Sequence, residues 1–225
     1  MSVTPAAVPL SSPRPRPRLR GWLHAWAFPV SLLAGGTLVA VVAPTVGARA
    51  AVPTAVYSVT VSLLFGTSAL YHRVTWQPRA RAIMKRLDHS MIFVFIAGTY
   101  TPFSVLVLPH DTGTVVLAVV WGGAFAGTAL KMARPGGSRW VSVPIYLALG
   151  WVAVFVLPAL WHVGVVALVL ILAGGAIYTA GAVVYALRRP DPVPTVFGYH
   201  EVFHLCTVVA ALCHYVAVWL AVYSG

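Results

Sequence analysis

The sequence predicts an all-α membrane protein, a bundle of seven transmembrane helices with a cytoplasmic amino terminus and an external carboxyl terminus. The 225 residues are 60% hydrophobic and only 8% charged, whereas the water-facing surface of soluble domains brings charged residues to about 25%. The mean hydropathy of +0.87 therefore indicates that lipid is the main solvent. The number and orientation of the helices follow from the basic residues between the apolar segments.

Each apolar segment is long enough for a helix that crosses the hydrocarbon core, which takes about 20 residues. The first is much longer than the apolar core of a signal peptide, so we expect it to stay as a helix. The expected helices cover residues 22–43, 51–72, 87–109, 113–132, 139–158, 160–187 and 199–223. Residues 1–20 are rich in Pro and Arg and predict a disordered cytoplasmic tail, which leaves residues 21–225 as one transmembrane domain.

The basic residues alternate between the two sides of the predicted membrane. Of the 15 Lys and Arg residues, 14 fall in the tail and in the second, fourth and sixth connections, and Arg49 alone falls in the first. Lys and Arg concentrate in cytoplasmic loops, and this alternation holds for seven spans but not for six or eight.

The same distribution bears on partners and location. The sequence pI near 10.4 does not predict nucleic-acid binding, because nucleic-acid-binding proteins gather their charge on a hydrophilic face. Arginine is much commoner than lysine, and Ala and Val abound, which favours a GC-rich bacterial genome. We therefore expect the inner (plasma) membrane of a bacterium, with membrane lipids as the partners.

Five polar residues lie inside or at the edge of the predicted spans, and a charged side chain at the centre of a span costs about 2.5–3.5 kcal/mol. Ser68 and His72 are four residues apart near the end of the second helix, and therefore share a face. Asp88 is expected to open the third helix, where the helix dipole also favours a carboxylate. His200 and His204 share a face at the start of the seventh helix, a spacing that lets two imidazoles reach one metal. Taken singly, each group also fits an ordinary interfacial or buried residue.

The topology brings these groups together. The second helix ends, and the third and seventh helices begin, at the same membrane face, so residues from three helices can meet at one depth. Three imidazoles and a water form an open tetrahedral zinc site of the catalytic kind, which predicts that His72, His200 and His204 hold Zn²⁺. Asp88 and Ser68 are then placed to hold the water, an imidazole or the substrate.

Other histidines fit this site less well. His24 and His89 lie at the right depth but have no partner at a helical spacing, so we expect both to be interfacial. His214 lies about 15 Å from His204 along the helix axis, too far to bind the same metal.

The segment from His200 to His204 also reads as H-E-x-x-H, the motif of zinc proteases in which the glutamate is the general base. The extended form of that motif is absent, since Thr207 and Ala210 stand where a glycine and a third histidine belong. Glu201 lies about 100° from the face that the two histidines share. An intramembrane protease therefore stays an alternative that rests on this short motif alone.

Three segments, SALYHR, RLDHSMIFVFIAGTYTPF and GYHEVFHL, resemble the haemolysin III family, which is related to the adiponectin and progestin receptors and more distantly to the alkaline ceramidases. The resemblance covers nearly the whole chain after residue 20. It implies zinc held by His72, His200 and His204. It also implies that Asp88 orients the attacking water or accepts its proton, and that Ser68 polarises the scissile carbonyl.

These observations favour a zinc-dependent hydrolase of lipid amide or ester bonds. A first alternative is a lipid or membrane-state sensor, resembling a receptor, in which zinc is structural; the short tail holds no evident hormone-binding domain. A second is the cytolysin that the family name suggests, although a secreted pore-former should carry a cleavable signal or have a soluble form, and the sequence indicates neither. The intramembrane zinc protease is the third.

Overall fold

The computed structural model describes residues 16–133 and 138–224, and within them seven helical segments are long and apolar enough to cross a membrane. This confirms the predicted fold class. The seven segments are α1 (Trp22–Thr45), α2 (Ala48–Arg73), α3 (Pro78–Leu106), α4 (His110–Ala133), the segment Arg139–Val163, α7 (Val165–Leu187) and α8 (Tyr199–Val222). The first fifteen residues of the expected tail lie outside the described residues.

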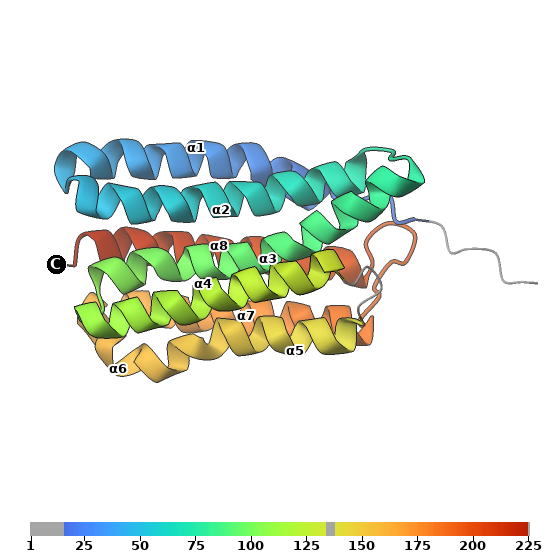
Figure 1. The fold of residues 1–225 in the computed structure, drawn as a ribbon. Helices are drawn as coiled ribbons and strands as arrows, with labels where there is room; N and C mark the ends of the chain where they lie inside the picture. Colours follow the sequence, from blue (N-terminus) through green and yellow to red (C-terminus); the bar gives the residue numbers. More distant parts are fainter. Residues whose placement is uncertain (1–15, 134–137, 225) are drawn as a thin grey trace, which may run out of the picture.

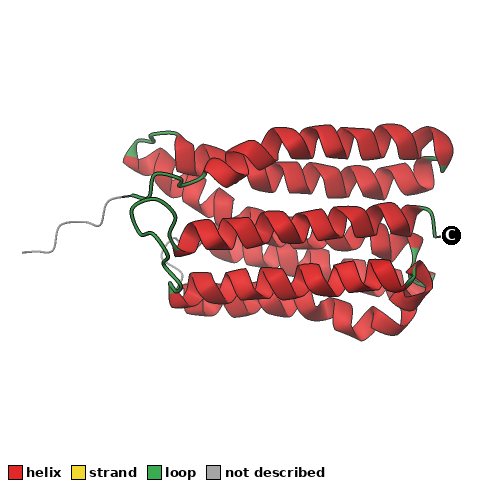
Figure 2. Cartoon of the chain, turned by 180° about the vertical axis from the view of Figure 1, so that it is seen from behind, coloured by secondary structure: helices red, strands yellow, loops and turns green. Residues whose placement is uncertain are grey.

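Consecutive helices run in opposite directions (Figures 1 and 2). Helix α8 packs most extensively against α7 and also contacts α1, α2 and α3. The carboxyl terminus lies at the opposite end of the bundle from the start of α1 (Figure 1). As a result, the end of α2 and the starts of α1, α3 and α8 meet at one end.

The outer surface of the bundle is apolar, as lipid requires. Large side chains such as Phe155, Leu33 and Phe125 are 86%, 74% and 68% exposed. Inside, buried hydroxyl groups bond to their own helices: Thr54 and Ser58 each donate to the carbonyl oxygen four residues earlier, at 2.9 and 2.8 Å. Such bonds satisfy polar groups where no water is available.

Close packing of α2 against α3 depends on Gly98. A β-carbon at this position would lie 1.9 Å from the hydroxyl oxygen of Thr60, so the two backbones approach only because the side chain is absent. Small residues at helix contacts are typical of membrane proteins, in which close backbone approach provides much of the packing energy.

Helix α3 begins at Pro78, nine residues before the expected start at residue 87. Proline is favoured in the first turn of a helix, and the Arg, Ala and Lys residues that follow are good helix formers. The helix therefore extends beyond the apolar segment that marked it in the sequence. The expectation that Asp88 opens this helix is wrong, because Asp88 lies in its third turn.

The fifth span and the start of the sixth also differ from expectation. The fifth is broken into α5 (Arg139–Gly150), the 3₁₀ turn η1 (Trp151–Val156), α6 (Leu157–Leu160) and the 3₁₀ turn η2 (Trp161–Val163). The sixth span was expected from residue 160, but Gly164 has φ 98° and ψ 155°, a conformation that only glycine adopts readily. Helix α7 therefore begins after it, at Val165.

Residues 16–20, assigned to the tail from the sequence, contact the connection between α7 and α8. The backbone N–H groups of Arg18 and Leu19 donate to the carbonyl oxygens of Thr195 and Val196, at 2.9 and 3.1 Å. We call residues 16–20 the amino-terminal segment. It lies across the end of the bundle at which α8 begins.

Candidate metal centre

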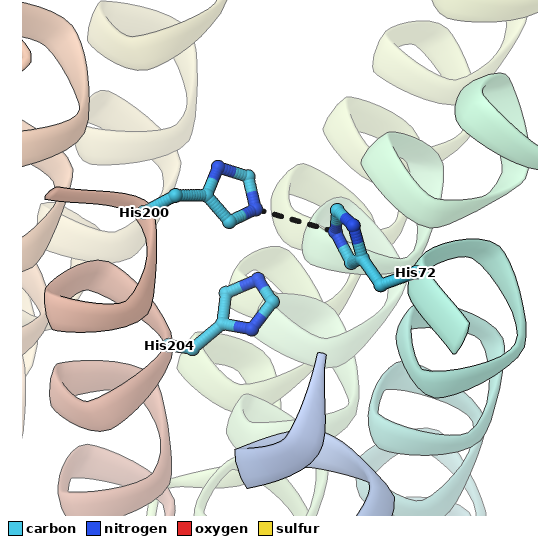
Figure 3. A group of neighbouring side chains, drawn as sticks. All are labelled: His72, His200 and His204. Atoms are coloured by element: carbon cyan, nitrogen blue, oxygen red, sulfur yellow. Dashed lines mark hydrogen bonds between the residues drawn. The ribbon is translucent and has the colours of Figure 1, made fainter. Parts of the chain in front are cut away.

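Three histidines from two helices face one another at this end of the bundle (Figure 3). His72 projects from the last turn of α2, and His200 and His204 project from the first two turns of α8. His72 and His204 are only 5% and 3% exposed, and His200 is partly buried. The structure therefore brings together the three histidines that the sequence predicted as ligands.

The spacing of the imidazoles fits one metal ion. The Nε2 atoms of His72 and His200 are 3.2 Å apart (Figure 3), and one ring nitrogen from each of the three histidines lies within 4.8 Å of the others. Two nitrogens bound at 2.0–2.1 Å with tetrahedral geometry are about 3.3 Å apart. The donor set and its spacing therefore fit a metal ion held by three imidazoles.

Asp88 and Ser68 lie beside the histidines, as the sequence predicted. The Oδ2 atom of Asp88 is 3.9 Å from Nε2 of His72, and Ser68 is 2% exposed, one turn before His72 on α2. Both side chains line a cavity of about 240 Å³ together with His200 and His204. A carboxylate and a hydroxyl are thus present where a small molecule could approach the imidazoles.

His24 is a member of this group that the sequence analysis missed. It was expected to be interfacial, but it is 3% exposed, and its ring stacks on that of His204 with centroids 3.9 Å apart and planes 5° from parallel. The expectation is wrong because α1 packs against α8 and α2 and covers this side chain. Among the described residues, neither ring nitrogen of His24 has a hydrogen-bond partner.

Glu201 is bound by groups other than the histidines. One carboxylate oxygen accepts a hydrogen bond from the backbone N–H of Gly198 at 2.9 Å, which caps the first turn of α8. The other accepts from Nε of Arg20 in an ion pair. Glu201 is 1% exposed, so this pair fixes the amino-terminal segment to the helix that carries His200 and His204.

His89 follows Asp88 on α3, and its side chain is partly buried. Its Nδ1 atom is 2.7 Å from the carbonyl oxygen of Lys85 and 3.6 Å from Oδ2 of Asp88. The imidazoles of His89 and His72 therefore both lie near the same carboxylate oxygen of Asp88. His89 lines the same cavity of about 240 Å³ but is not one of the three clustered histidines.

The fold and the site together define a class of protein: a multi-pass membrane protein with a three-histidine candidate metal centre inside one end of its helix bundle. Comparison with known families identifies it further. A family model described as "Haemolysin-III related" matches residues 13–215, and the chain belongs to this family.

Curated relatives agree with this assignment. The chain is 29% identical over 150 residues to the "Hemolysin-3 homolog" of Bacillus subtilis (strain 168), a match that covers 66% of this chain and 67% of the relative. It is 33% identical over 143 residues to "Hemolysin-3" of Bacillus cereus, covering 63% and 65%. A shorter match of 49 residues, 41% identical, covers 20% of this chain and 16% of the "ADIPOR-like receptor IZH2" of Saccharomyces cerevisiae (strain ATCC 204508 / S288c). The chain thus matches about two thirds of the length of its bacterial relatives.

Proposed function

We propose that this chain is an inner-membrane enzyme that binds zinc through His72, His200 and His204 and hydrolyses amide or ester bonds of membrane lipids near the cytoplasmic face. One observation carries the proposal. Asp88 and Ser68 line the same cavity as two of the clustered imidazoles, and the third imidazole lies 3.2 Å from one of these. A structural metal would need no carboxylate and hydroxyl at an accessible cavity.

Zinc suits this donor set. Imidazole nitrogen is a common zinc ligand, and catalytic zinc sites use three protein ligands and keep one position open. A bound zinc ion would polarise a carbonyl group and lower the pKa of water at the site.

The chain's own groups supply the remaining chemistry. The carboxylate of Asp88 is placed to orient a water molecule in the cavity and to accept its proton, the role of a general base. The hydroxyl of Ser68 is placed to donate a hydrogen bond to the carbonyl oxygen of the substrate as negative charge develops on it. Ser68 reaches the cavity from α2 and Asp88 from α3, the two most buried of the described spans.

An apolar cavity next to the site offers room for part of an acyl chain. It has a volume of about 90 Å³ and lies between α3, the fifth span, α7 and α8. Phe95 and Tyr178 line both this cavity and the one at the histidines. A lipid whose polar bond lies at the histidines could therefore place apolar carbons in the adjoining space.

The test is turnover of labelled lipid amides and esters, with ceramides among them, by purified protein in nanodiscs. The proposal predicts turnover that a zinc chelator abolishes and added zinc restores. Release of product that is indifferent to the chelator, or no release across the panel, would contradict it.

One observation favours a second candidate, a sensor in which zinc is structural: the short match to a protein named a receptor. A sensor would bind lipid without turnover. The protease alternative is weaker, because the carboxylate of Glu201 is bound by Arg20 and Gly198. The cytolysin alternative predicts lysis of erythrocytes by the purified protein.

A further inference from the structure

A third cavity, of about 440 Å³, is lined by His72 but not by Asp88 or Ser68. Four arginines from three parts of the chain line it, and we call it the arginine cavity. Arg16 and Arg20 belong to the amino-terminal segment, Arg81 to the first turn of α3, and Arg188 to the carboxyl-terminal end of α7. Its volume is many times the roughly 30 Å³ that one water molecule occupies in the liquid.

Among the described residues, a carboxylate pairs with one of these four arginines and with none of the other three. All four acidic residues of the chain lie within the described residues. Asp88 is beside His72 and His89, and Asp111 is beside the exposed His110 on the first turn of α4. Glu201 pairs with Arg20, which leaves Asp191 as the remaining carboxylate.

Asp191 lines the arginine cavity, but its Oδ1 atom accepts a hydrogen bond from the backbone N–H of Tyr199 at 2.9 Å. In the part of the chain that the structure describes, no carboxylate forms an ion pair with Arg16, Arg81 or Arg188. Positive charge therefore exceeds negative charge in this cavity.

The pKa of the Arg16 guanidinium responds to the neighbouring cations. It is lowered from the usual value, first by partial burial and then by the positive charges of Arg20, Arg81 and Arg73. Like charges that line one cavity repel one another, and an anion bound between them would relieve that repulsion.

The backbone of Arg188 supports a role for its side chain. This residue follows α7 with φ 57° and ψ 31°, the left-handed conformation that usually belongs to glycine at the end of a helix. A residue with a β-carbon is strained there. Arg188 nevertheless occupies the position, and its side chain lines both the arginine cavity and the cavity at the histidines.

Orientation in the membrane does not explain this arrangement. Basic residues act as orientation signals wherever they lie in a cytoplasmic connection. Arg79 and Arg189 satisfy that requirement without lining the arginine cavity, whereas Arg16, Arg81 and Arg188, which are also exposed, all line it. Two backbone hydrogen bonds hold the amino-terminal segment beside the cavity, and the ion pair with Glu201 holds Arg20.

We propose that the arginine cavity binds a phosphate group, either the headgroup phosphate of an anionic phospholipid or free phosphate. Guanidinium groups bind phosphate oxygens in pairs of charge-assisted hydrogen bonds. A phosphate bound here ties the amino-terminal segment to α3 and α7. Gly21, the residue that follows this segment, packs on the metal centre, since a β-carbon on Gly21 would lie 2.4 Å from the β-carbon of His72. This site is separate from the proposed hydrolysis and does not depend on it.

The experiment compares two sources of phosphate with the full chain, purified and delipidated in detergent. One arm measures the shift in melting temperature with inorganic phosphate against chloride at equal ionic strength. The other arm compares the shift in melting temperature caused by dihexanoylphosphatidylglycerol with that caused by dihexanoylphosphatidylcholine. Each compound that raises the melting temperature is then titrated to give its Kd.

Two variants remove cavity arginines, and two neighbours serve as controls. Arg81→Gln and Arg188→Gly should each weaken binding about tenfold or more. Arg188→Gly also relieves the backbone strain, so its stability without phosphate should equal or exceed that of the wild type. Arg79→Gln and Arg189→Gln change the same net charge outside the cavity and should leave the affinity unchanged.

A response to inorganic phosphate that both cavity variants weaken supports the proposal with free phosphate as ligand. A response confined to the phosphatidylglycerol arm, with the same variant pattern, supports it with a lipid headgroup as ligand. Absence of a response in both arms, or equal weakening by the control variants, would overturn it. If Arg81→Gln does not fold, the comparison of phosphate affinity between Arg188→Gly and its control Arg189→Gln decides the test.

Discussion

His24 of α1 and His204 of α8 stack face to face, with ring centroids 3.9 Å apart and planes 5° from parallel. His24 also packs against Phe65 of α2, at 5.0 Å between centroids. It therefore fills the space between the two helices that carry the clustered histidines. We infer that His24 positions the ring of His204, although it is not a member of the three-histidine group.

Replacement of His24 tests this role. His24→Ala should destabilise the protein by about 2 kcal/mol, the low end of the range for truncating a large buried side chain, because two unpaired ring nitrogens are removed as well. His24→Phe keeps a flat ring against His204 and should retain both stability and bound zinc. Metal content and thermal unfolding of the purified variants provide the measurements. If His24→Phe lost its zinc, His24 would be a ligand and not a packing residue.

The metal assignment makes a second prediction. The purified chain should bind about one zinc ion, and replacement of His72, His200 or His204 by Ala should weaken binding sharply and lower the melting temperature, because metal binding is linked to folding. His89→Ala is the matched control, since His89 lines the same cavity outside the three-histidine group. The zinc content of the wild type and of each variant is measured by metal analysis after dialysis. Zinc retained by the triple variant would show that the assignment is wrong.

The buried ion pair between Glu201 and Arg20 makes a third prediction. Removing one partner of a buried pair leaves the other charge uncompensated. Glu201→Gln should cost about 3 kcal/mol, at the low end for such pairs because Arg20 keeps some contact with solvent. Thermal unfolding should show that Arg20→Gln in the same chain recovers part of the loss. Asp111→Asn is the control, since Asp111 and His110 are fully exposed and exposed pairs contribute at most about 1 kcal/mol.

Orientation in the membrane is the fourth prediction. The arginines and lysines that set the positive-inside pattern predict an external carboxyl terminus and a cytoplasmic connection between α2 and α3. Alkaline phosphatase fused at the carboxyl terminus should be active, and fused after Arg79 it should be inactive. Activity at both points, or the reverse pattern, would place the candidate metal centre at the opposite face.

The positions of the spans and the three-histidine cluster could be predicted from the sequence because both depend on local patterns. Apolar length marks a span, a spacing of four residues puts His200 and His204 on one face, and the direction of successive spans puts His72 at the same end. Each inference needs only residues of one helix and the alternation of helices.

The rest depends on packing between distant segments, which local patterns do not record. His24 is a single histidine on α1, and nothing near it in sequence indicates that its ring stacks on His204. Arg20 and Glu201 are 181 residues apart, so the order of the amino-terminal segment follows from a contact that composition cannot reveal. Similarly, α3 extends beyond its apolar segment because its basic first turns have good helix propensity, which hydropathy does not measure.

The fifth prediction separates an enzyme from a sensor and concerns Asp88. If zinc only joins α2 to α8, Asp88→Asn should change neither metal content nor function. If Asp88 accepts a proton from the attacking water, its loss should lower turnover about 10²–10⁴-fold while the three imidazoles still hold zinc. The amide keeps the shape of the carboxylate, so zinc content measured beside turnover distinguishes lost chemistry from a lost site.

Ser68→Ala completes the comparison. Loss of one hydrogen-bond donor to a developing oxyanion costs about 10²–10³-fold in rate, so its effect on lipid turnover should be smaller than that of Asp88→Asn, again with zinc retained. Ser62→Ala serves as its control, because Ser62 is also buried on α2 but its hydroxyl pairs with Ser31 at 3.1 Å, away from the histidines. Normal turnover in both Asp88→Asn and Ser68→Ala would remove the reason for placing a carboxylate and a hydroxyl beside the zinc. A sensor with structural zinc would then be the better description of the site.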